Sequence, residues 1–178
     1  MSILRSSPCL LAFLLLVGSA GAAAEPTSSR EAQMAAAYVF NFAKFVEWPP
    51  HAQGDTLNIC FLGADAVRAA LADATADKRV GSRGIVVQAL ARGEKGQACH
   101  VIYVDAPLER ELANLHTAAA LTIGESESFT RAGGVIRLYT ENNRLRFIVN
   151  VANAKRAGLS VSSNLLQLAT RVELGAAQ

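Results

Sequence analysis

Residues 57–63 read Leu-Asn-Ile-Cys-Phe-Leu-Gly, a nearly continuous apolar run that leads directly into Ala-Asp. The pattern returns as His-Val-Ile-Tyr-Val-Asp at residues 100–105 and as Ala-Leu-Thr-Ile-Gly at residues 120–124. Short apolar runs that end in glycine or aspartate are typical of strands that are buried on both faces of a parallel sheet. The three runs therefore predict the central strands of an α/β domain.

Segments between these strands predict helices that cross over the sheet. One helix is expected over Asp65–Ala72, another from Pro107 to about His116, and a short one over Ser126–Arg131. Gly84–Leu90 is expected to form an edge strand between the first two runs. Because strands that alternate with helices form mostly parallel sheets with right-handed crossovers, we expect helices on both faces of the sheet.

The C-terminal third departs from this alternation. Val135–Thr140 and Leu145–Val151 are separated by too few residues for a crossover helix, so they predict a C-terminal antiparallel hairpin. Ala152–Ala157 is expected to form one or two helical turns, and Ser162 to begin a last amphipathic helix. The apolar stripe of that helix would comprise Leu165, Leu168, Ala169 and Val172.

Residues 1–24 have the layout of a secretory signal peptide. Arg5 precedes an apolar run over Cys9–Val17, and the small residues up to Ala24 provide an A-x-A cleavage site. The run is shorter than the about 20 apolar residues of a membrane span, so a retained anchor is the weaker alternative. We expect residues 25–178 to form one exported α/β domain in the periplasm, without insertion into the membrane.

Charge and motifs exclude several classes of function. Without Arg5 the 17 basic residues become 16, against 15 acidic ones, which gives no electrostatic reason to bind nucleic acid. The histidines lack the spacing of zinc ligands, and the sequence contains neither a nucleophile elbow nor a phosphate-binding loop with its lysine. We therefore predict no metal, no cofactor and no catalytic site.

Acidic residues follow the predicted strands at their carboxyl ends, namely Asp65, Asp105 and Glu125. In a doubly wound sheet these ends border a crevice in which small ligands bind. Asp105 also stands where the phosphate-accepting aspartate of a receiver domain would be, but the acidic pair for magnesium and the later lysine are missing. The crevice suggests an alternative function as a periplasmic small-ligand carrier or an uncharacterised enzyme.

The predicted N-terminal helix, Ser29–Trp48, carries one aromatic residue away from its apolar stripe. At about 100° per residue, Phe40 falls with Lys44 and Glu47 on the polar face. Such an aromatic residue is either covered by another element or reserved for a partner, and its angular position does not decide between the two. We treat Phe40, Lys44 and Glu47 as a candidate contact patch.

Cys60 and Cys99 are the only cysteines after the signal peptide. In an oxidising compartment such a pair persists as a disulfide, and the alternative is two buried free thiols. Both cysteines lie on strands that would be neighbours in a 2-1-3 order, in which the strand at residues 57–63 runs between those at residues 84–90 and 100–105. Neighbouring strands are about 4.8 Å apart, which is compatible with disulfide geometry, so we predict a Cys60–Cys99 disulfide.

Four stretches of the chain carry a family likeness: Tyr38–Pro49 (YVFNFAKFVEWP), Ile59–Gly63 (ICFLG), Ala98–Tyr103 (ACHVIY) and the region from Arg146 to Ser163. In this order and at this spacing they resemble the YfiR family of periplasmic regulators. The resemblance implies a repressor without enzymatic activity, which binds the periplasmic region of a YfiN-like inner-membrane diguanylate cyclase. Such binding would lower cyclic di-GMP synthesis and biofilm formation.

The resemblance further implies a homodimer and control through cysteine pairing. The stretch Ser126–Tyr139, however, lacks the second cysteine pair found in the matching region of YfiR, so redox behaviour that depends on that pair does not carry over. Many relatives also have an acidic residue after the phenylalanine, where this chain has Ile148. A polar contact at that position is therefore not assumed.

The hairpin and the turn after it are the predicted partner surface, because the matching region of YfiR is implicated in partner binding. If the hairpin lies at the sheet edge, Ile148 would be only partly covered, and the next turn would expose polar and basic side chains. The alternative is that Ile148 is ordinary core and the basic residues form a solvated helix face. The candidate contact residues are Ile148, Asn150, Asn153, Lys155 and Arg156.

Overall fold

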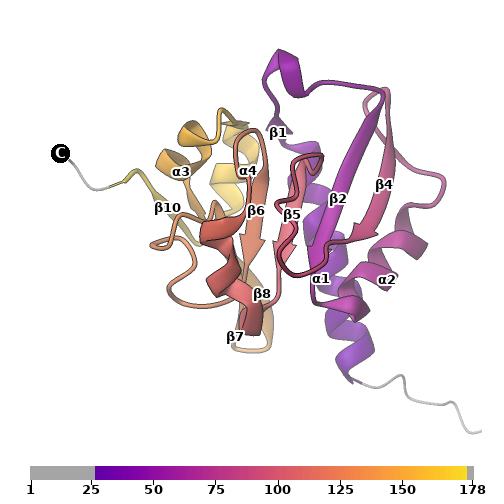
Figure 1. The fold of residues 1–178 in the computed structure, drawn as a ribbon. Helices are drawn as coiled ribbons and strands as arrows, with labels where there is room; N and C mark the ends of the chain where they lie inside the picture. Colours follow the sequence, from indigo (N-terminus) through magenta and orange to yellow (C-terminus); the bar gives the residue numbers. More distant parts are fainter. Residues whose placement is uncertain (1–26, 176–178) are drawn as a thin grey trace, which may run out of the picture.

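The computed structural model describes residues 27–175, which form one mixed α/β domain (Figure 1). The predicted signal peptide, residues 1–24, lies outside the described residues. Eight strands form the main sheet in the order β10-β8-β7-β6-β5-β2-β4-β3, and β1 pairs with β9 separately. All neighbours in the main sheet are parallel except β7 with β8 and β3 with β4. The mostly parallel sheet predicted from the sequence is confirmed.

Each of the three apolar runs forms a central strand. They are β2 (Thr56–Leu62), β5 (Val101–Val104) and β6 (Leu121–Gly124), and β5 lies between the other two. Every residue of β5 and β6 is buried, which explains why their sequences lack polar alternation. β4 (Arg83–Ala89) pairs with the other side of β2, and the short β3 (Arg79–Val80) pairs with the start of β4.

The predicted hairpin is also confirmed. β7 (Ile136–Glu141) and β8 (Arg144–Asn150) pair in antiparallel fashion, and Asn142 and Asn143 connect them. Both asparagines have positive φ angles, 49° and 59°, as the favoured two-residue hairpin turns require. Asparagine adopts this left-handed region more readily than most residues, so the turn is encoded locally.

The predicted last helix is wrong in its second half. α4 (Ser163–Leu168) ends early, and Arg171–Glu173 instead form β10, which pairs in parallel with β8. Leu168 is 69% exposed, so the apolar spacing of this segment does not correspond to a buried stripe. Because β10 covers the outer side of β8, the hairpin does not lie at the sheet edge.

The N-terminal helix ends earlier than predicted. α1 (Thr27–Lys44) is followed by β1 (Val46–Glu47), which pairs with β9 (Ser160–Val161). Trp48 is buried, and its indole Nε1 donates a hydrogen bond to the backbone oxygen of His100 at 3.1 Å. These contacts draw the chain onto the sheet before the short 3-10 helix η1 (Pro50–Ala52) begins.

The two faces of the sheet are covered differently. α1 and α2 (Asp65–Thr75) pack on one face and share its core with residues such as Ile59 and Tyr103. On the other face the cover includes η2 (Ala106–Asn114), a 3-10 helix where a helix from Pro107 to about His116 was predicted, and it contributes Leu112. The short α3 (Val151–Arg156) follows β8 directly.

The helix predicted over Ser126–Arg131 is wrong, because this stretch forms successive turns. Its residue Phe129 is 1% exposed and packs against the backbone of two glycines. A Cβ atom at Gly124 would lie 2.4 Å from the Phe129 ring, and one at Gly134 would lie 2.1 Å from it. The turn is therefore shaped by tertiary packing of this ring, which local periodicity does not encode.

Candidate functional site

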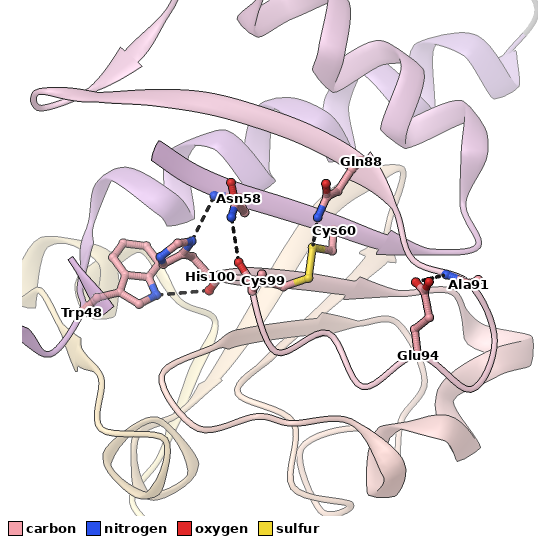
Figure 2. The surroundings of a disulfide bond; sticks show 9 residues. Trp48, Asn58, Cys60, Gln88, Ala91, Glu94, Cys99 and His100 are labelled. Atoms are coloured by element: carbon pink, nitrogen blue, oxygen red, sulfur yellow. Dashed lines mark hydrogen bonds between the residues drawn. A yellow bond between two sulfur atoms is a disulfide. The ribbon is translucent and has the colours of Figure 1, made fainter. Parts of the chain in front are cut away.

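The disulfide predicted from the sequence is present and joins β2 to the segment just before the neighbouring strand β5 (Figure 2). Cys60 lies on β2 and Cys99 lies just before β5, with a Cα–Cα distance of 5.8 Å. Both cysteines are buried, and the side-chain amide of Gln88 approaches the Cys60 sulfur at 3.4 Å. The bond therefore ties the loop before β5 to the centre of the sheet.

His100, next to Cys99, is fixed by hydrogen bonds at both ring nitrogens, and Figure 2 shows the one from Asn58. The backbone N–H of Asn58 donates to Nδ1 at 3.0 Å, so Nδ1 is the unprotonated nitrogen. Nε2 then carries the proton and donates to the Ala52 oxygen at 3.0 Å. Burial, assisted by the positive charge of Arg83, lowers the pKa of His100. These contacts give His100 a structural role in its neutral form.

The three carboxylates predicted to border a crevice are engaged in separate contacts. Asp65 is largely exposed and forms an ion pair with Arg68 at 3.0 Å. Asp105 accepts a long hydrogen bond from the backbone N–H of Ala64, at 3.4 Å. Glu125 accepts a hydrogen bond from the hydroxyl of the buried Tyr103. The residues thus lie where the strands end, but each has its own partner.

Glu109, which was not among the residues predicted from the sequence, binds the loop that follows β6 at this edge of the sheet. Its Oε1 accepts hydrogen bonds from the backbone N–H groups of Glu125 and Ser126, each at 2.8 Å, and its Oε2 accepts the Ser126 hydroxyl. Burial and the charge of Glu125 raise the pKa of Tyr103, which keeps its hydroxyl neutral as a donor. The carboxylates here hold the loops together.

A groove of about 520 Å³ lies beside this edge, between the start of α1 and the hairpin. Glu125 lines it, together with Arg30, Met34 and Tyr139, but neither Asp65 nor Asp105 does. The crevice inferred from strand ends is therefore not one cavity shared by the three carboxylates. In residues 27–175 no group of three or more His, Cys, Asp or Glu side chains is arranged to hold a metal ion.

The candidate patch on α1 is only partly accessible. Phe40 is half-buried and packs against the core, while Lys44 and Glu47 are exposed. The ammonium groups of Lys44 and Lys78 lie 5.5 and 5.4 Å from the centre of the Phe40 ring, within cation–π range. Glu47 belongs to β1 rather than to the helix, so the angular argument that grouped it with Phe40 does not apply.

The hairpin segment proposed as a contact surface is mostly buried. Ile148 is 3% exposed, because β10 pairs with β8 and Arg137 and Arg171 lie beside it in register. The expectation that Ile148 would be partly uncovered at a sheet edge is therefore wrong. In contrast, Lys155 and Arg156 are exposed, as predicted.

The two asparagines of this segment have structural roles. The Asn150 side chain caps α3 by accepting the backbone N–H of Asn153 at 2.9 Å, and it also donates to Glu173. Asn153 donates to the backbone oxygens of Thr130 and Gly134, at 2.8 and 2.6 Å. Asn153 is only 5% exposed, so the expectation that the turn presents it to solvent is wrong. Both side chains hold α3 against the sheet.

Four arginines surround this segment, and sequence reasoning singled out only one of them. We define the C-terminal basic surface as Arg131, Arg137, Arg156 and Arg171. Arg131 and Arg156 line a groove of about 520 Å³, and Arg131 also lines an adjoining small cavity with Arg137 and Arg171. Within residues 27–175 none of the four forms an ion pair. Arg137 could have been found from the sequence, because the two-residue turn of the predicted hairpin places it directly opposite Ile148.

These features define a class of protein: a single α/β domain with a buried cross-sheet disulfide, whose polar residues mainly fix loops and short helices. In residues 27–175 no helix is long and apolar enough to cross a membrane. The model of the YfiR/HmsC-like family matches residues 32–170, and the chain therefore belongs to the YfiR/HmsC-like family.

A solved structure has a similar fold, whereas the curated proteins give no match. The chain is similar in fold to a conserved domain protein from Vibrio cholerae O1 biovar El Tor strain N16961, with a TM-score of 0.52 and 10% sequence identity. The match covers 80% of this chain and 60% of the Vibrio chain, so this chain spans somewhat less than two thirds of the Vibrio chain. No curated protein matches the sequence. The structural match supports the fold alone.

Proposed function

We propose that this chain is a periplasmic negative regulator that binds the periplasmic region of a YfiN-like inner-membrane diguanylate cyclase and restrains cyclic di-GMP synthesis. The observation that carries the proposal is the family match, which spans residues 32–170 and thus almost the whole described domain. The family likeness also favours a homodimer. Regulation by binding needs a rigid, accessible surface rather than a reactive centre.

The C-terminal basic surface, together with the adjacent Lys155, is the part of the domain that best fits such binding. Within residues 27–175 its cations form no ion pair, and all of them except the half-buried Arg137 are exposed. The exposed cations can therefore meet carboxylates of another protein, although Glu127 and Glu173 line the same cavities. Arginine is enriched among the residues that dominate binding energy at protein interfaces, because its planar group pairs with carboxylates and packs on apolar surface. The buried Ile148 would support this surface from below without being a contact itself.

The buried disulfide supports a location outside the cytoplasm. Disulfides persist in the periplasm, whereas reducing systems keep most cytosolic thiols free. Cys60 and Cys99 are paired and are 0% and 6% exposed. Together with the signal-peptide layout of residues 1–24, this pairing favours export.

A small-ligand carrier is the second candidate. The groove beside Glu125 has the volume of a small-molecule site and combines apolar residues with the charges of Arg30 and Glu31. Ligand binding there would raise the melting temperature, and the rise would grow with the logarithm of the ligand concentration once that concentration exceeds Kd. It would leave cyclic di-GMP unchanged unless the ligand also controls the regulator.

Deletion of the gene and measurement of cyclic di-GMP tests the regulatory function. We expect the level to rise on deletion and to return with the wild-type gene. Lys155→Glu combined with Arg156→Glu, and separately Arg131→Glu combined with Arg171→Glu, should fail to restore repression while the protein accumulates folded.

Arg92→Glu combined with Lys95→Glu is the matched control, because both side chains are exposed in the segment that follows β4, toward the opposite end of the main sheet from β10, and neither lines the cavities of this surface. If deletion leaves cyclic di-GMP unchanged, the regulatory function is wrong. If the charge reversals repress as well as the control does, the regulatory function stands, but another surface binds the cyclase.

A further inference from the structure

A cavity lies between the amino end of β6 and the short helix α3, and neither the crevice argument nor the partner surface includes it. Its volume, about 280 Å³, suits a molecule smaller than the ligands of typical pockets, which are about 300–1,000 Å³. We call it the α3 cavity, and it is lined by Thr117, Ala120, Thr122, Gly133, Val135, Asn153, Arg156 and Ala157.

Hydrogen bonds hold the walls of the α3 cavity in place. The Asn153 side chain donates to the backbone oxygens of Thr130 and Gly134, at 2.8 and 2.6 Å. The backbone N–H of Ala119 donates to the Ala157 oxygen at 2.7 Å, which joins the segment before β6 to the end of α3. The cavity is therefore preformed, and a ligand would need to order little of the chain in order to bind.

Thr122 contributes a buried hydroxyl to the α3 cavity. The residue is 1% exposed, and its Oγ1 accepts the backbone N–H of Val135 at 3.0 Å. A hydroxyl can also donate one hydrogen bond, and within residues 27–175 the structure shows no acceptor for this hydrogen. Because buried polar groups normally have partners, the Thr122 hydroxyl is suited to donate to an oxygen atom of a ligand.

Arg156 is the only charged residue among those that line the α3 cavity. Its side chain is exposed, so it lies where the cavity meets solvent. One of its N–H groups donates to the Asn153 side-chain oxygen, and the guanidinium has further N–H donors for a ligand. The cavity thus carries one permanent positive charge, and no carboxylate lines it to offset that charge.

This lining fits a small organic molecule with one carboxylate. Guanidinium and hydroxyl groups both donate to carboxylate oxygens, and such charge-assisted hydrogen bonds are strong. Ala120, Val135 and Ala157 offer apolar contact to a short hydrocarbon body. A phosphate ester would bring a second negative charge without a second cation. The ammonium group of an amino acid would find no acidic side chain in the lining.

We propose that the α3 cavity binds a small organic monocarboxylate, with the carboxylate group held between Arg156 at the mouth and Thr122 inside. Arg156 also belongs to the C-terminal basic surface, so a bound carboxylate occupies a cation that would otherwise meet the partner. The ligand therefore weakens binding of the cyclase and relieves repression. This consequence rests on the proposed function, whereas binding to the cavity does not.

Nuclear magnetic resonance titration of the purified protein with sodium butyrate tests the site, at an ionic strength kept constant with sodium chloride. The amide signals of Thr122 and Ala157 should shift and saturate. Butyramide has the same shape without the charge, and α-aminobutyrate adds an ammonium group, so both should bind roughly tenfold more weakly or less. No saturable shift with butyrate, or equal affinity for all three compounds, would overturn the proposal.

Single variants locate the binding. Arg156→Gln should raise the Kd for butyrate by roughly tenfold or more, because it removes the charged donor. Lys155→Gln is the matched control, since it removes the same charge from the next residue, which is exposed but does not line the cavity. Equal effects of the two variants on the Kd would contradict the proposed site, because they would indicate a general effect of net charge.

The buried hydroxyl is tested in the same titration. Thr122→Val should weaken butyrate binding, and Thr122→Ser, which keeps the hydroxyl, should preserve it. Should Thr122→Val unfold because the Val135 N–H loses its acceptor, the comparison of Arg156→Gln with Lys155→Gln decides alone. A folded Thr122→Val protein that binds butyrate like the wild type would contradict the placement of the carboxylate inside the cavity.

Cyclic di-GMP measurements separate the site from the proposed function. Butyrate in the medium should raise cyclic di-GMP in the wild-type strain and have no effect in the deletion strain. If deletion itself leaves cyclic di-GMP unchanged, the regulatory function is wrong, while the titrations still decide whether the cavity binds a carboxylate. If deletion raises cyclic di-GMP but butyrate does not, although it binds the purified protein, the proposed control of the cyclase by this cavity is wrong.

Discussion

Reduction of the Cys60–Cys99 disulfide should strongly destabilise the domain without changing its fold. The perturbation is incubation of the native protein with dithiothreitol under mild denaturant, which leaves all side-chain atoms in place. Both cysteines are buried, so reduction should proceed only through partial opening of the structure. The oxidised protein should therefore resist reductant until it begins to unfold.

The magnitude follows from the length of chain between the two cysteines. Their sequence separation is 39 residues, and on the chain-entropy model closing such a loop in the unfolded state contributes about 4 kcal/mol to stability. Domains of this size are stable by only about 5–15 kcal/mol in total. At about 2–4 °C per kcal/mol, the reduced protein should melt roughly 8–16 °C below the oxidised protein.

Urea denaturation of the oxidised and reduced forms, followed by circular dichroism, measures this difference. The double variant Cys60→Ala with Cys99→Ala should resemble the reduced protein and should not respond to dithiothreitol, although its lost sulfur atoms add a packing cost. Equal unfolding midpoints for the oxidised and reduced wild type would refute the loop-closure reasoning. They would mean that the unfolded chain is already compact around this pair, or that the native bond is strained by the same amount.

Three further predictions concern the stability of the domain and test the contacts of His100, Phe40 and Gly134. Burial lowers the pKa of His100, so below about pH 6.5 the unfolded chain binds more protons than the folded chain. The free energy of unfolding should therefore be constant above this pH and fall as the pH drops below it. Urea titrations of His100→Gln should show a weaker dependence on pH. Phe40→Ala should cost about 2 kcal/mol in thermal unfolding, less than the roughly 3–5 kcal/mol of a fully buried phenylalanine, and an unchanged melting temperature would show that the ring is a free surface group. Gly134→Ala should cost about 1–3 kcal/mol by displacing the Phe129 ring, and adding Phe129→Ala should make the two losses less than additive; strict additivity in denaturant titrations would contradict the packing account.

Strand identity was predictable because burial on both faces leaves a direct mark on the sequence. β5 and β6 are buried at every position, and their uninterrupted apolar residues follow from that environment. The hairpin was predictable because its two-residue Asn-Asn turn is too short for any crossover. The disulfide followed from the predicted strand order with only two cysteines left to pair.

The remaining elements depend on contacts between distant parts of the chain. β10 was missed because three residues are too few to show alternation, and its identity depends on β8 being available as a partner. The burial of Ile148 follows from that pairing, so the error in the helix produced the error in the site. The turns over Ser126–Arg131 were missed for the same kind of reason, since Phe129 is held by glycines on both sides of the segment.

Asn150 and Asn153, which were predicted to contact a partner, instead hold the short helix α3 in place. A helix of six residues is unstable in isolation, because the cost of starting a helix exceeds the gain from so few hydrogen bonds. Here Asn150 caps its start, and Asn153 joins it to the backbone of Thr130 and Gly134. These buried bonds fix the position of the exposed Arg156, which also donates to Asn153. Loss of the Asn153 amide should therefore weaken partner binding by disordering a charged surface whose net charge is unchanged.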